Sequence, residues 1–354
     1  MNSTTPFNPY EQSFTLLGAD GTPFNVTIPD LDSLLYYYTQ SSINFGAQLG
    51  ASIVLLIVLL LLTKRDKRTS AIFIINALAL VFNIIRTVMF CLYFTGPWVE
   101  TYAYFGQDYA RVHTRDYAES VNSSVFTFLV LVCIDTSLCL QTRVVCITLR
   151  SIYRIGILTA SILVALVGIG FHFTLAVENC ILIVDAKAED SLNWIVSASQ
   201  IANTISISFF CTVFTVKLGF ALRQRKKLGL VQFGPMQVLF IMGCQTLVIP
   251  VLFSVLQFCV SSPQIGSNTL TSAAIFLPLS SLWASASLDS HFADSKAQHF
   301  SGKTISSYAT KSSGPMEERK TANVPRHDNG HMMYRDLEAQ GLAGTGDFVG
   351  KEQT

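Results

Sequence analysis

The chain has 354 residues, of which 50% are hydrophobic and only 13% are charged, and its formal net charge is +1. An average soluble domain is about 25% charged, so this charge is too sparse to cover a soluble surface unless it is segregated. The composition also excludes a nucleic-acid-binding protein, which would need a basic stripe on a soluble face.

The charged residues are concentrated outside seven apolar runs of membrane-spanning length. A helix needs about 20 apolar residues to cross a bilayer core of about 30 Å. Only five charged residues fall inside the runs, and these are Arg86, Asp135, Arg143, Arg154 and Lys217. The sequence therefore predicts an all-α membrane protein, a seven-transmembrane helix bundle with spans at about 46–63, 71–93, 122–147, 152–176, 194–220, 236–260 and 268–288.

The basic residues predict on which side of the membrane each end of the chain lies. Residues 1–45 carry acidic charges only, and the first connection, Lys64 to Arg68, is basic, as are the connections after the third and fifth runs. The positive-inside rule then places the N-terminus outside and the C-terminus in the cytoplasm. We expect an extracellular segment at 1–45, a bundle at 46–288, and a cytoplasmic tail at 289–354 whose polar composition predicts disorder.

The outer segment carries two glycosylation sequons, and the chain has eight cysteines. The sequons predict glycosylation of Asn2 and Asn25 on the outer segment. The cysteines lie mostly inside the runs and lack the C-x2-C spacing of a metal site, so packing is their expected role. We expect no metal or cofactor, and membrane lipid as one partner.

Polar side chains inside the runs are candidates for a ligand-binding or activation network. An ionisable residue at membrane depth is costly and usually faces the bundle interior. Arg86 and Asp135 could pair directly or through water, as a ligand floor, as a latch between states, or as a static helix contact. Asn76, Gln141 and Gln245 lie on the inner halves of their runs, where buried amides bridge helices by hydrogen bonds.

Prolines and glycines mark two further features of the predicted bundle. Pro250 and Pro278 interrupt the sixth and seventh runs, because proline removes a helix hydrogen bond and bends the axis. They predict either hinges or static kinks. Gly46 and Gly50 form a GxxxG motif that opens the first run and predicts a close helix–helix contact, often a dimer.

Three classes of membrane protein compete for this pattern. The sequence lacks the H-E-x-x-H and G-x-S-x-G motifs and has no paired carboxylates in the runs, so we expect no enzyme and no catalytic residue. A channel or transporter for a small solute is the alternative, although such proteins commonly show internal repeats. A signalling receptor needs an outer pocket, a movable bundle, a basic inner surface and a tail, and the pattern permits all four.

Several long motifs stand in order along the runs. From the fifth run onward they are Lys217-Leu218 with Arg223, Leu228-Gly229-Leu230-Val231-Gln232-Phe233, Cys244-Gln245-Thr246-Leu247-Val248-Ile249-Pro250 and Leu277-Pro278-Leu279-Ser280-Ser281-Leu282-Trp283-Ala284. Upstream motifs are Phe73-Ile74-Ile75-Asn76 and Asp135-Thr136-Ser137-Leu138 with Gln141. In these residues, over about 40–288, the sequence resembles the fungal alpha-factor-type mating pheromone receptors, a class D family of G-protein-coupled receptors.

The resemblance implies a plasma-membrane receptor that binds a secreted peptide pheromone outside and couples to the Gα subunit of a heterotrimeric G protein inside. The signal would drive mating or chemotropic growth, and the receptor would form homodimers with the GxxxG motif near the interface. Phe258 stands where some family members have a tyrosine near the outer end of the sixth span. We expect the peptide to enter between the N-terminal segment, the connection from Thr95 to Val121 and the outer ends of the last three spans.

The connection after the fifth run is the expected site of G-protein coupling. By the resemblance, the coupling contacts are Leu228, Gly229, Leu230, Gln232 and Phe233. The cations beside them could steer an acidic Gα surface, or could serve only to fix the topology. These cations are Arg223, Arg225, Lys226 and Lys227.

Overall fold

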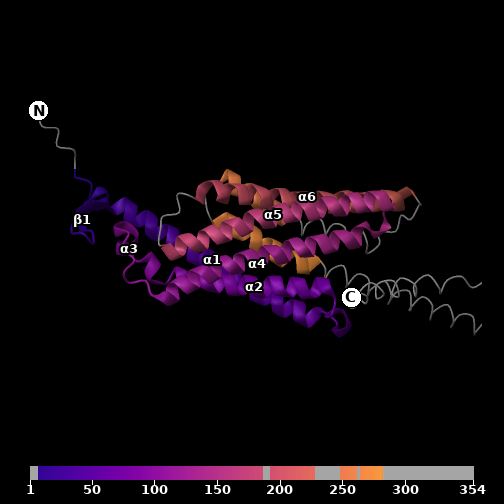
Figure 1. Cartoon of the computed structure of the whole chain (residues 1–354), viewed down its shortest axis with the longest axis horizontal. Coiled ribbons are helices and arrows are strands. Elements are labelled where there is room, and N and C mark those ends of the chain that lie inside the picture. Colours follow the sequence, from indigo (N-terminus) through magenta and orange to yellow (C-terminus); the bar gives the residue numbers. More distant parts are fainter. Residues whose placement is uncertain (1–6, 186–191, 228–247, 261–263, 281, 283–354) are drawn as a thin grey trace, which may run out of the picture. The chain divides into compact units, whose positions relative to one another are not determined.

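The computed structural model describes residues 7–185, 192–227, 248–260, 264–280 and 282, and long helices dominate this part of the chain (Figure 1). Five of them are long and apolar enough to cross a membrane. They are α1 (Ile28–Leu62), α2 (Ala71–Tyr93), α4 (Thr114–Val145), α5 (Ser151–Asp185) and α6 (Asn193–Lys227). Two shorter helical segments follow, Val248–Cys259 and 264–280.

Capping residues, as well as the apolar runs, determine where the helices begin and end. α2 has the bounds of the second predicted run, and the side chain of Ser70 caps it by accepting a hydrogen bond from the backbone of Phe73. α1 begins at Ile28 rather than at 46, because Thr27 and Asp30 form a capping box there. The apolar run therefore marks only the part of α1 suited to the membrane, and the helix continues well beyond it.

A β-hairpin precedes α1, in a segment for which the sequence predicted no element. Strands β1 (Ser13–Leu17) and β2 (Pro23–Thr27) pair antiparallel. Thr22 donates two hydrogen bonds to Asp20 in the turn, which hold the pKa of that carboxyl below its usual value. The Tyr102 hydroxyl donates to the Leu17 carbonyl oxygen at 2.9 Å and so places α3 (Thr101–Gly106) against the hairpin. We call this the hairpin end of the bundle (Figure 1).

The opposite end of the bundle carries basic residues. The turn η2 (Arg65–Lys67) joins α1 to α2, and Arg68 donates to the carbonyl oxygens of Leu60 and Thr63 at the end of α1. The last turns of α6, where Arg223 is exposed, lie at the same end (Figure 1). We call this the basic end.

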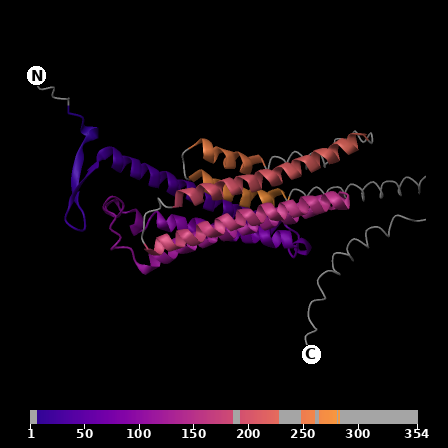
Figure 2. The same ribbon diagram turned by 45° about the horizontal axis from the view of Figure 1, so that its top comes forward.

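The core lies where α4, α6 and segment 264–280 meet. Phe210 of α6 is fully buried among Leu131 and Ile134 of α4 and Ala274 and Leu277 of the segment. Figure 2 shows this orange segment running in the middle of the bundle. Small residues such as Ala274 let helices approach closely, which is how helices pack in lipid.

Candidate functional site

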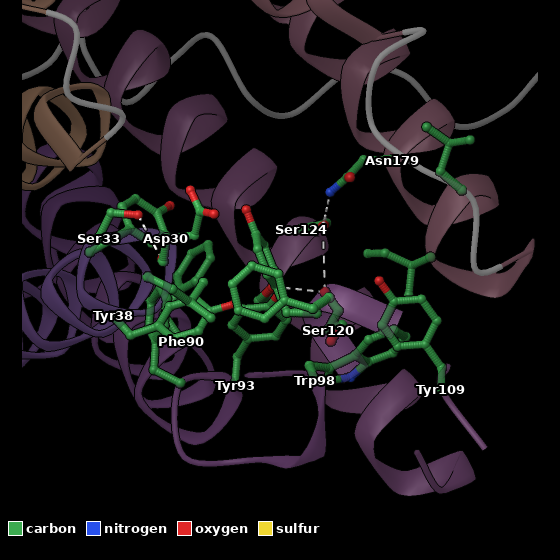
Figure 3. A pocket seen from close by; sticks show the side chains of 18 residues that line it. Asp30, Ser33, Tyr38, Phe90, Tyr93, Trp98, Tyr109, Ser120, Ser124 and Asn179 are labelled. Atoms are coloured by element: carbon green, nitrogen blue, oxygen red, sulfur yellow. Dashed lines mark hydrogen bonds between the residues drawn. The ribbon is translucent and has the colours of Figure 1, made fainter. Parts of the chain in front are cut away.

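A cavity of about 760 Å³ opens at the hairpin end (Figure 3). Its walls come from α1, α2, the connection between α2 and α4, and the facing ends of α4 and α5. A volume of this size is ordinary for a ligand pocket and would hold part of a peptide. Nine aromatic residues line it, and these are Tyr37, Tyr38, Phe90, Tyr93, Phe94, Trp98, Tyr104, Phe105 and Tyr109.

The aromatic rings contact one another across separate segments of the chain. Tyr38 of α1 lies 6.0 Å from Phe94 and 6.3 Å from Tyr104, between ring centroids. Trp98 lies 6.5 Å from Tyr93 and 5.3 Å from Tyr109. Aromatic pairs in this range stabilise one another beyond simple area burial, so the rings hold the connection between α2 and α4 against α1.

The cavity also has polar groups, mainly serine and tyrosine hydroxyls, and Asp30 is the only charged residue among those that line it. One oxygen of Asp30 accepts from the Thr27 hydroxyl at 2.6 Å. On the far wall the Asn179 amide donates to the Ser124 hydroxyl at 2.7 Å and so ties α5 to α4. Figure 3 shows Asp30 on one side of the cavity and Asn179 on the other.

The N-terminal segment and the connection from Thr95 to Val121, which we expected around the peptide, line the cavity together with α2, α4 and α5, whereas the described residues of the last three spans do not. Phe258 is 52% exposed near the end of segment Val248–Cys259 and does not line the cavity. The physical reason is the dense group of aromatic residues between 93 and 109, whose packing over α2 and α4 forms the walls. A role of Phe258 in ligand binding stays a prediction.

Below the cavity, Arg86 joins α1, α2 and segment 264–280. Its guanidinium donates to Gln48 Oε1 at 3.2 Å, to the Ser267 hydroxyl at 2.6 Å and to the Thr271 hydroxyl at 3.3 Å. The guanidinium also lies 5.8 Å from the ring centroid of Phe90, which lines the cavity. Arg86 is 1% exposed, so a buried cation sits just behind an aromatic wall of the cavity.

The contacts of Arg86 belong to a larger buried network. Gln48 donates to Asn268 at 2.8 Å, Thr271 donates to Asn83 at 3.3 Å, and Asn83 donates to Ser52 at 2.8 Å. We call these residues, with Arg86 and Ser267, the Arg86 network. The sequence analysis missed most of them, although Gln48 with Ser52, and Ser267 with Thr271 at the start of the seventh run, are spaced by four residues, which places each pair on one helix face.

Asp135 lies apart from the Arg86 network. The Ser206 hydroxyl of α6 donates to one carboxylate oxygen at 3.0 Å, and the other oxygen faces Gly168 of α5. Asp135 is 2% exposed. Of the pairings that the sequence left open, the structure therefore shows no contact between Arg86 and Asp135, and each side chain ties a different set of helices.

The structure brings together two of the three predicted amides. The Ser137 hydroxyl donates to Asn76 Oδ1, and Gln141 Nε2 donates to the same hydroxyl at 3.3 Å. This chain of contacts joins α2 to α4, and Asn76 is buried. Gln245, the third predicted amide, lies outside the described residues.

The glycines and prolines occupy different surroundings. Gly46 and Gly50 are exposed on one face of α1, where an added Cβ would meet nothing within 4 Å. Pro250 is buried in segment Val248–Cys259, and Pro278 is buried in segment 264–280. Whether Pro250 and Pro278 act as hinges stays a prediction.

The remaining predicted residues that the structure describes lie near the two ends. Asn25 is exposed in β2 and accepts a hydrogen bond from Thr15 at 2.8 Å. Arg223 is exposed, and Arg225, Lys226 and Lys227 continue α6 to its end. The residues of these predictions that lie outside the described part of the chain are Asn2, Leu228, Gly229, Leu230, Gln232 and Phe233.

Comparison with known proteins found one matching family and several related receptors. The family described as "Fungal pheromone mating factor STE2 GPCR" matches residues 7–285. The chain is 31% identical over 327 residues to the pheromone alpha factor receptor of Saccharomyces cerevisiae, which covers 86% of this chain and 73% of that receptor. It is 28% identical over 330 residues to the pheromone alpha factor receptor of Lachancea kluyveri, with 88% and 75% covered. It is also 25% identical over 280 residues to the pheromone P-factor receptor of Schizosaccharomyces pombe, with 77% and 80% covered.

Proposed function

The chain belongs to the STE2 family of fungal pheromone G-protein-coupled receptors, and from this premise we propose that a secreted peptide pheromone binds at its hairpin end while a heterotrimeric G protein couples at its basic end. It is a multi-pass protein of the plasma membrane. The single observation that supports this division is the position of the aromatic cavity, which opens at the end of the bundle opposite Arg223.

The proposed topology places the hairpin end outside the cell. The basic connection Lys64 to Arg68 then faces the cytoplasm, as the positive-inside rule requires. Seven spans follow if segments Val248–Cys259 and 264–280 belong to the sixth and seventh. An odd number of spans puts the tail from 289 in the cytoplasm, and it leaves Asn2 and Asn25 on the outer side, where glycosylation is possible.

Signalling requires the peptide to bind the active bundle more tightly than the resting one, since only differential affinity shifts a population. A preference of about 2–3 kcal/mol shifts the ratio of states roughly 30- to 150-fold. The Arg86 network offers a physical link, because Phe90 contacts the cavity on one side and Arg86 on the other. A peptide that contacts Phe90 could therefore change how α1, α2 and segment 264–280 pack against one another.

Coupling is proposed at the end of α6 and in the connection that follows. The cations are Arg223, Arg225, Lys226 and Lys227, and the apolar and polar contacts are Leu228, Gly229, Leu230, Gln232 and Phe233. A cationic surface speeds the encounter with an acidic Gα partner and helps to set its orientation.

Peptide-dependent nucleotide exchange tests the proposed function. The full-length receptor, reconstituted in lipid nanodiscs with a fungal Gα, is given the mature peptides encoded by pheromone-precursor genes of the same genome. We expect at least one peptide to accelerate exchange, and charge reversal at Arg223 and Arg225 to reduce the acceleration without changing peptide binding. Solute flux in liposomes without G protein, together with no exchange, would instead support a channel or transporter.

We also propose a homodimer in which the Gly46 and Gly50 face of α1 meets its copy. Both glycines are exposed, and a Cβ at either position would meet no atom of the described residues within 4 Å. Leucine at both positions would therefore fold normally but block close approach, and we expect about tenfold weaker dimerisation, measured by energy transfer between labelled receptors. Gly170→Leu is the matched control, because Gly170 is equally open on α5. An equal effect of the control, or a monomeric parent receptor, would contradict this interface.

A further inference from the structure

We propose that the cavity at the hairpin end selects a peptide segment that carries a positive charge beside an apolar side chain. In this arrangement Asp30 and the nearby rings receive the cation, and Trp98 and Ser120 bind carbonyl oxygens of the peptide backbone. The inference rests on the proposed function, because it assigns the peptide to this cavity.

The first support is the charge of the cavity. Asp30 is the one charged residue among the eighteen that line it, and none of them is Lys, Arg or His. One Asp30 oxygen is engaged by Thr27, and Oδ1 accepts no hydrogen bond from the described residues. Residues 7–45 hold acidic residues and no basic one, and the nearest cations of the connection, Arg111 and Arg115, are already paired with Glu100 and Glu119. A cationic ligand group is the complement of such a surface.

The second support is the position of the rings relative to Asp30. Asp30, Ser33, Leu34, Tyr37 and Tyr38 all line the cavity and follow one another at helical spacing, so they form a single face of α1. An ammonium or guanidinium group near Asp30 would therefore have the rings of Tyr37 and Tyr38 about two turns along the same wall. Cations bind over aromatic rings through the ring quadrupole, and the ring edges leave room for an apolar side chain.

The third support is a pair of buried polar atoms without partners. Trp98 Nε1 and Ser120 Oγ are both buried and form no hydrogen bond among the described residues, and both residues line the cavity (Figure 3). The indole N–H can only donate, so its complement is an acceptor oxygen. A peptide offers such oxygens at every residue, whereas its own N–H groups would leave Trp98 unsatisfied.

Binding of small amides to the full-length receptor in nanodiscs tests the inference without the pheromone. The probes are phenylalaninamide, N-acetylphenylalaninamide and N-acetylphenylalanyl-lysinamide, and saturation-transfer NMR measures their affinities. We expect the two cationic amides to bind about three- to fivefold more tightly than the neutral one. A preference for phenylalaninamide alone assigns the cation to the peptide N-terminus, and a preference for the lysinamide alone assigns it to a side chain.

Three substitutions identify the residues responsible for the preference. Asp30→Asn keeps an oxygen that can accept the hydrogen bonds from Thr27 but removes the charge. It should therefore abolish the preference for the cationic amides. Asp32→Asn makes the same charge change at an exposed site outside the cavity and should leave the preference intact. Trp98→Phe keeps a ring but loses the donor, and should weaken all three probes.

The inference is overturned if the neutral amide binds as tightly as the cationic ones, if no probe binds, or if the preference survives Asp30→Asn. These outcomes are distinct from failure of the proposed function. A receptor whose own peptide drives nucleotide exchange but which shows no cation preference loses only this inference. A receptor with the preference but no exchange with any peptide loses the proposed function.

Discussion

Replacement of Gln48 by leucine is expected to lower the free energy of unfolding by about 2–4 kcal/mol, because it strands a buried charge. Gln48 Oε1 accepts from Arg86, Ser267 and Thr271, and Gln48 Nε2 donates to Asn268. Leucine fills a similar volume but accepts nothing. The Arg86 guanidinium would then lose its amide acceptor while remaining 1% exposed, and would keep only the hydroxyls of Ser267 and Thr271.

A double-mutant cycle separates this effect from simple loss of packing. Arg86→Met removes the charge and keeps the apolar stem, so the double variant Gln48→Leu/Arg86→Met should regain at least half of the stability lost in Gln48→Leu. Unfolding of the purified receptors in one detergent, followed by circular dichroism, measures the four free energies. Gln40→Leu, on an exposed position of the same helix, should change stability by less than about 0.5 kcal/mol. Strictly additive losses would show that Gln48 and Arg86 are not coupled.

Replacement of Asn76 by leucine is expected to raise basal signalling about 5- to 30-fold, which corresponds to about 1–2 kcal/mol of preference between two states. Asn76 accepts from Ser137, and Gln141 donates to the same hydroxyl, so the contact holds α2 and α4 in one register. Leucine removes the acceptor, and Ser137 then loses its partner across the helix contact. We expect the pair of helices to shift more easily to the arrangement that couples to Gα.

Nucleotide exchange without peptide, at matched receptor levels, measures the basal activity. Ser137→Ala should also raise basal exchange, and the double variant should exceed Asn76→Leu by little, because both substitutions remove the same hydrogen bond. Thr136→Val is the matched control, since the Thr136 hydroxyl is exposed and donates only within its own helix, to the Val132 carbonyl oxygen. Unchanged basal exchange in Asn76→Leu, with normal peptide binding, would show that the hydrogen bond between Asn76 and Ser137 does not control the balance between the two states.

The sequence by itself determined that the chain forms long apolar helices, and in α2 it determined both ends. It also identified the family, through motifs such as Asp135 to Leu138 with Gln141. The physical reason is locality. A transmembrane helix satisfies its backbone hydrogen bonds within one segment, so the length of an apolar run and its capping residues predict it without reference to any other part of the chain. The helix α1 began earlier than its run for an equally local reason, the capping box of Thr27 and Asp30.

Only the tertiary structure decided which polar residues meet. The opposite charges of Arg86 and Asp135 and their depth in the membrane predicted a possible ion pair between them. In the structure, Arg86 instead contacts Gln48, Ser267 and Thr271, and Asp135 contacts Ser206. The aromatic cavity likewise joins α1 and α5, which no spacing along the chain connects. A side chain's partner depends on the rotation of its helix and on which helices pack beside it. These are properties of the whole bundle and are absent from any single run of residues.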